Sequence, residues 1–93
     1  MSFTKESAVE RAKQDLAQRL GVSESEITDS VTDMEFPDMA LGAPEDGEMA
    51  AQMITSGWRI DLKANGKNYE YRAQKYGELR LRDFNGTNYI IES

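Results

Sequence analysis

The 93 residues carry a net charge of −6 and are 39% apolar and 30% charged, which predicts a single globular domain over residues 1–93. No apolar run reaches the length of a membrane span, and the N-terminus lacks the apolar stretch of a secretory signal, so we expect a cytoplasmic protein. Cysteine and histidine are absent, which excludes disulfides, thiolate nucleophiles and the usual catalytic and zinc-binding arrangements.

Residues 5–20 have the period of a one-sided amphipathic helix. Thr4 or Ser7 can cap its start, and Ser7 with Glu10 fits a capping box, while Gly21 is typical of the position after a helix. The apolar side chains of this stripe recur at spacings of three and four and are Val9, Ala12, Leu16 and Leu20.

A second capping box, Ser23 to Glu26, predicts a short turn, and residues 27–36 then read as a strand that ends at Pro37. The segment 37–57 is the least regular part of the chain, with two prolines, three glycines and three methionines. A loop of about 20 residues is uncommon in a compact domain and is usually functional or partly structured.

From Gly57 onward apolar and polar residues alternate, and Asn65-Gly66 marks a two-residue hairpin turn. This turn pairs Leu62 with Tyr69 and Ile60 with Tyr71, so that large apolar side chains share one face. The alternation therefore predicts two paired antiparallel strands.

Lys75-Tyr76-Gly77 suits a three-residue turn with Gly77 in the left-handed region, which sets Tyr71 opposite Leu81 and Ala73 opposite Leu79. Asn85-Gly86 then leads to a last strand over residues 87–91. The expected fold is α+β, with one N-terminal helix packed on a mainly antiparallel sheet that consists of one strand, a long loop and a four-stranded meander.

By simple alternation, Phe84, Tyr89 and Ile91 fall on the polar face of the meander. Apolar side chains on that face would form a partner contact or a homodimer edge, or they would be covered by the 37–57 loop, whose methionines adapt to irregular gaps.

Charge is unevenly distributed, because residues 22–58 contain nine acidic side chains and no Lys or Arg. This argues against nucleic-acid binding. The acidic side chains form a solvated surface or a divalent-cation site, although no calcium-loop pattern is present and we expect no metal. The polar face of the meander is rich in arginine, which suggests an anion-binding face or a charged face with the acidic segment as its intramolecular counterpart; these arginines are Arg59, Arg72, Arg80 and Arg82.

These features favour a non-catalytic interaction or inhibitor-type module that presents the 37–57 loop, with no enzyme activity and no cofactor. The alternative is a small-ligand or ion-binding domain that uses the acidic segment or the arginine face. The expected partner is another protein, not nucleic acid or a membrane, and the chain is expected to be a monomer or a weak homodimer. The candidate binding residues are Pro37, Asp38, Met39, Leu41, Gly42, Pro44, Met49 and Met53.

Several sequence blocks resemble an uncharacterised bacterial family of short, often exported proteins, chiefly Leu41-Gly-Ala-Pro44 and Gly57-Trp-Arg-Ile60. In that family the position of Ala43 is commonly cysteine, paired with another near the chain end; both are absent here, so no disulfide is carried over. The resemblance implies no activity. The order of elements is also similar to PepSY and cystatin-like domains, many of which inhibit or regulate proteases, although fold alone does not fix function.

Overall fold

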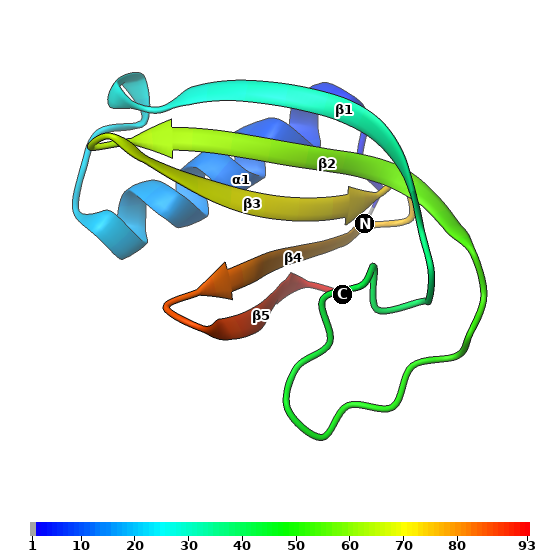
Figure 1. Ribbon diagram of the computed structural model, residues 1–93. Coiled ribbons are helices and arrows are strands. Elements are labelled where there is room, and N and C mark those ends of the chain that lie inside the picture. Colours follow the sequence, from blue (N-terminus) through cyan, green and yellow to red (C-terminus); the bar gives the residue numbers. More distant parts are fainter. Residues whose placement is uncertain (1) are drawn as a thin grey trace.

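A computed structural model describes residues 2–93 and shows an α+β fold, in which one helix packs against a five-stranded antiparallel sheet (Figure 1). The strands lie in chain order, so the predicted strand, loop and four-stranded meander are confirmed. The elements are α1 (Lys5–Leu20), a 3-10 turn η1 (Glu24–Glu26), β1 (Thr28–Phe36), β2 (Thr55–Ala64), β3 (Lys67–Gln74), β4 (Glu78–Phe84) and β5 (Thr87–Glu92).

Helix α1 begins at a reciprocal cap between Thr4 and Ser7, each side chain accepting the other residue's backbone N–H. The predicted capping box of Ser7 with Glu10 is therefore wrong, because the hydroxyl of Ser7 accepts the backbone N–H of Thr4. The helix ends at Gly21, which is left-handed as expected (φ 68°). Within residues 2–93, no helix has the length and apolar character needed to cross a membrane.

The predicted register of β2, β3 and β4 is confirmed, with Ile60 opposite Tyr71 and Tyr71 opposite Leu81. These side chains form a core with the apolar stripe of α1, and Ala8 joins this stripe although the sequence pattern did not single it out. The fully buried members of the core on the sheet and the helix are Ala8, Ala12, Leu16, Ile60, Leu62, Tyr71, Ala73, Leu79 and Leu81.

The turn between β3 and β4 has the predicted length, since Gln74 pairs with Glu78 across three residues. Gly77 has a φ of 108°, which an L-residue rarely adopts. The loop length keeps Ala73 and Leu79 on the same apolar face, as the alternation required.

The expected position of Phe84, Tyr89 and Ile91 on the polar face is wrong, because all three pack against the core. A β-bulge lies between Leu81 and Phe84, and Asp83 takes a left-handed conformation there (φ 56°) while its N–H donates to the Asn88 side chain. One extra residue in a strand reverses the face of every later side chain, so strict alternation fails at this point.

Candidate functional site

Residues 37–48, here called the anchored limb, begin with a tight turn built on Asp38. Its carboxylate accepts the backbone N–H of Ala40 at 2.9 Å and that of Gly42 at 3.0 Å. Leu41 and Gly42 are both left-handed, with φ of 58° and 66°. This conformation costs a leucine on the order of 1 kcal/mol, so the surrounding contacts must hold it in place.

Arg72 of β3 provides one of these contacts, because its Nη1 donates to the Leu41 carbonyl at 2.9 Å. The Leu41 side chain is fully buried, and a Cβ on Gly42 would stand 2.6 Å from the same Arg72 nitrogen. The guanidinium also donates to Glu70 at 2.6 Å and lies 5.2 Å from the centre of the Phe36 ring. The turn is therefore docked against a fixed arginine.

Arg80 of β4 holds the other end of the anchored limb. It forms two hydrogen bonds to the Glu48 carboxylate, at 2.5 and 2.7 Å, and its Nη1 also donates to the Ala43 carbonyl at 3.2 Å. Glu78 accepts its Nε at 2.6 Å, and Arg80 is only 3% exposed. The hydrogen bond from Arg80, helped by the backbone N–H of Glu45, lowers the pKa of Glu48 from 4.5 to about 2 against the opposing effect of burial.

Strand β5 completes the attachment. The Asn88 side chain donates to the Pro44 carbonyl at 2.8 Å, and the Ile90 backbone N–H donates to the Glu45 carboxylate at 3.1 Å. The anchored limb thus crosses β3, β4 and β5 on the sheet face opposite α1. This part of the loop therefore covers the sheet, which is the alternative to a partner contact that the sequence left open.

Residues 49–54, here called the exposed limb, have a different character. Their large apolar side chains lie in solvent, with exposed fractions of 97% for Met49, 61% for Met53 and 72% for Ile54. Met39 is 49% exposed, and its backbone N–H donates to the Ala51 carbonyl at 3.0 Å, which ties the two limbs together. The exposed limb therefore presents apolar side chains to solvent, and the anchored limb that precedes it is fixed to the sheet.

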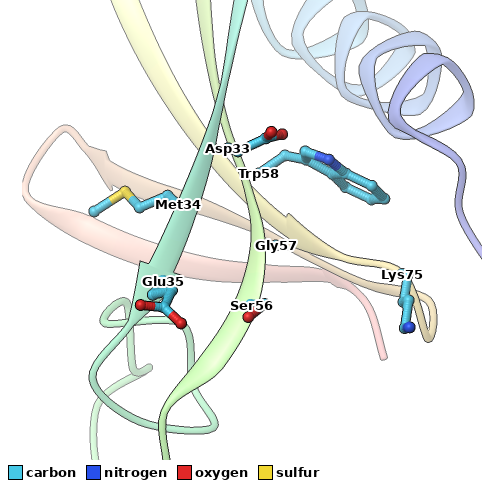
Figure 2. Close-up of a pocket in the computed structure, with 7 residues that line it drawn as sticks. All are labelled: Asp33, Met34, Glu35, Ser56, Gly57, Trp58 and Lys75. Carbon is cyan, nitrogen blue, oxygen red and sulfur yellow. The ribbon is translucent and has the colours of Figure 1, made fainter.

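A groove of about 570 Å³ lies where β1 and β2 approach the turn after β3 (Figure 2). The indole of Trp58 and the carboxylate of Asp33 lie on one side of the sheet there, while Met34 points the opposite way. Gly57 passes so close to the Ala73 carbonyl of β3 that a Cβ would overlap it, so the close approach of β2 to β3 requires a glycine there. Carboxylates beside an indole suit a cationic group.

The eight sequence-predicted binding residues divide between the two roles. Asp38, Leu41 and Gly42 build the docked turn, so the buried Leu41 side chain is not available to a partner. The exposed members are Pro37, Met39, Pro44, Met49 and Met53. Ile54 lies within the predicted 37–57 loop but was not among the predicted binding residues, although it is 72% exposed.

The arginine face is occupied largely from within the chain, which confirms the acidic segment as its counterpart through the Arg80–Glu48 pair. Arg59 lies 3.6 Å from the Glu70 carboxylate on the neighbouring strand. Arg72 bonds Glu70 on its own strand. Among the residues that the structure describes, no group of three or more acidic side chains is arranged to hold a metal ion.

A family model described as a domain of unknown function, DUF8738, matches residues 9–81. The chain belongs to this family. The matched part of the DUF8738 domain runs from α1 to β4 and therefore includes both limbs of the loop and the arginines Arg72 and Arg80. Comparison with curated proteins and with solved structures gave no match. The expectation of an uncharacterised small-domain family is confirmed, and no specific function follows from the match.

Proposed function

We propose that this DUF8738 domain is a non-catalytic protein-interaction module whose partner contacts the exposed limb. The observation that supports the proposal is the group of solvent-exposed apolar side chains on residues 49–54 and Met39, with Met49 at 97%. Single exposed apolar residues are ordinary on protein surfaces, but several on one short irregular segment are typical of a contact site.

The anchored limb supports this function through pre-organisation. Ordering a loop on binding costs free energy, and a loop that is already fixed avoids much of this cost. Arg72 and Arg80 fix the residues that precede the exposed limb, and β2 begins directly after it at Thr55. Methionine adds an adaptable apolar surface, because its unbranched side chain takes several shapes at little cost.

The finer parts of the proposal rest on sequence. We take the domain to be a cytoplasmic bacterial protein, monomeric or weakly dimeric, that acts as an inhibitor-type or adaptor module without cofactor. The order of helix, strand, loop and meander is similar to PepSY and cystatin-like domains and supports the inhibitor-type role. The absence of histidine and cysteine supports a non-catalytic one.

The test is partner capture from a native lysate by two matched variants. Replacing Met49, Met53 and Ile54 by Ser should abolish capture of any protein that the wild type retains specifically, while the melting temperature stays within a few degrees because these side chains bury little surface. The control is Tyr76→Ser, which removes another side chain that is 75% exposed, on the turn after β3. Equal capture by wild type and the triple variant, or equal loss in both variants, would contradict the proposed site.

A further inference from the structure

The two edges of the sheet differ in how they are protected against pairing with another chain. Strand β5 is short, its register with β4 is interrupted by bulges, and its Ile90 N–H is taken by the Glu45 carboxylate. These are devices by which natural proteins block an exposed edge. The anchored limb therefore helps to block the β5 edge of the sheet against pairing.

Strand β1 forms the opposite margin (Figure 1). All nine of its residues pair in unbroken register with β2, from Thr28 opposite Lys63 to Phe36 opposite Thr55. Within residues 2–93, the only strand beside β1 is β2. The edge of β1 that faces away from β2 therefore presents unpaired N–H and C=O groups. The strand contains no proline, no lysine and no bulge; its charged side chains are all carboxylates, which deter an acidic strand but not a basic one.

The side chains of β1 define what kind of strand would fit beside it. Every charged residue on β1 is acidic, and the register with β2 puts Asp29, Asp33 and Glu35 on the α1 side of the sheet. Asp29 and Asp33 approach Lys13 and Lys5 of α1 at 2.7 and 3.4 Å, yet the Asp33 side chain is still 81% exposed. The whole chain, at −6, also repels an acidic partner.

The other face of β1 is uncharged, because Ser30, Thr32 and Met34 alternate with the carboxylates. Residues directly opposite each other on neighbouring strands have Cβ atoms about 5 Å apart, so an added strand meets each of these side chains in turn. Basic residues on alternate positions would lie beside the carboxylates, and uncharged ones beside the serine, threonine and methionine.

We propose that the free edge of β1 binds an extended segment of a partner protein by strand addition, with Lys or Arg at alternate positions of that segment. Backbone hydrogen bonds supply the pairing, and Asp33 with Glu35 selects the basic side chains. One of these side chains reaches the groove of Figure 2, where the Trp58 indole lies next to Asp33. Lys75, on the far side of the groove, directs its amine to the Tyr76 ring, 5.2 Å from the ring centre.

This inference concerns a different surface from the exposed limb and is tested separately. The probe is a short, capped, fluorescein-labelled peptide in which Lys alternates with Thr, titrated into the full chain by fluorescence anisotropy. The same peptide with N-methyl groups on all of its backbone amides keeps the charge and removes the donors that strand pairing needs, and a Glu–Thr peptide reverses the charge. Hydrogen exchange with and without the peptide locates the contact on the protein.

The expected results are binding of the Lys–Thr peptide, loss of binding on N-methylation, and new amide protection in β1. Asp33→Asn with Glu35→Gln should weaken binding roughly fivefold, as two exposed ion pairs are removed. The charge-matched control, Glu24→Gln with Asp46→Asn, changes exposed carboxylates outside β1 and should leave the affinity unchanged.

Three results would overturn the inference: no binding of the Lys–Thr peptide, equal binding of its N-methylated form, or equal weakening by both pairs of substitutions. The second and third would indicate diffuse attraction to an acidic protein. The variant with Ser at Met49, Met53 and Ile54 should bind the peptide as the wild type does. The peptide result therefore does not depend on whether the exposed limb captures a partner, and partner capture does not depend on the peptide result.

Discussion

The side chain of Glu48 helps to fix the anchored limb on the sheet. It accepts two hydrogen bonds from Arg80, whose guanidinium is almost fully buried beneath the anchored limb. A buried arginine needs partners for its donors, and Glu48, Glu78 and the Ala43 carbonyl supply them. Removing one of these acceptors leaves the cost of burying the guanidinium while weakening the hold on the loop.

Glu48→Gln should lower the free energy of unfolding at neutral pH by about 1 to 3 kcal/mol, because a charged hydrogen-bond partner of Arg80 is lost. The pKa of Glu48 in the folded chain, about 2, lies below its ordinary value of 4.5, so the stabilisation is complete above that ordinary value and is lost as the pH falls toward 2. Urea unfolding at several pH values should therefore show the difference between wild type and variant shrinking in acid. Asp46→Asn, on the same limb but exposed, should change the free energy of unfolding at neutral pH by less than about 0.5 kcal/mol.

Among the elements, the docking of α1 on the sheet depends on apolar burial and on a hydrogen bond from the centre of the sheet. Leu16 is fully buried in the core, and the Tyr71 hydroxyl donates to Asp15 at 2.7 Å. Burial, together with this hydrogen bond and the negative charge of Asp15, raises the pKa of Tyr71 above its usual range, which keeps the phenol protonated as a donor. Helix and sheet are thereby fixed in one relative position.

Leu16→Ala should cost roughly 2 to 5 kcal/mol in the free energy of unfolding, since it removes a large side chain from the centre of the helix contact. The comparison is Gln18→Ala on the solvent side of the same helix, which should change stability by less than about 0.5 kcal/mol. Chemical denaturation of both variants measures the difference, and a similar small effect in both would show that α1 does not dock through Leu16.

The meander could be predicted because its information is local: turn lengths at Asn65-Gly66 and Gly77 set the parity of each strand pair, and the apolar alternation agrees with it. The last hairpin could not, because the bulge depends on a left-handed Asp83 and on its bond to Asn88. Asp and Asn are common in turns and tolerate the left-handed region, but their presence near the Asn85-Gly86 turn does not by itself indicate a bulge, so the face of Phe84 was predicted wrongly.

The division of the loop was also beyond local reasoning. Its contacts join residues 31 to 45 positions apart, from Leu41 with Arg72 to Glu45 with Ile90. The sequence showed an irregular segment with one-sided charge, and showed arginines on the polar face, but no pattern stated which carboxylate meets which guanidinium. Candidate residues on the loop were therefore found as a group without their separate roles.

In the whole molecule, the β5 edge of the sheet is blocked, while two other surfaces remain exposed. The anchored limb covers β3, β4 and β5, while the apolar side chains of the exposed limb and the edge of β1 remain in solvent. The proposed function depends on this arrangement, because a loop that was not docked would not hold the exposed limb in a fixed position.

Native-state amide hydrogen exchange, resolved by residue within 37–54, tests this division most directly. We expect slow exchange at Ala40, Gly42 and Ala43, whose N–H groups are hydrogen-bonded within the docked turn. We expect fast exchange at Met49 and Gln52 on the exposed limb. Uniformly fast exchange across both limbs would show that the anchored limb is not docked on the sheet.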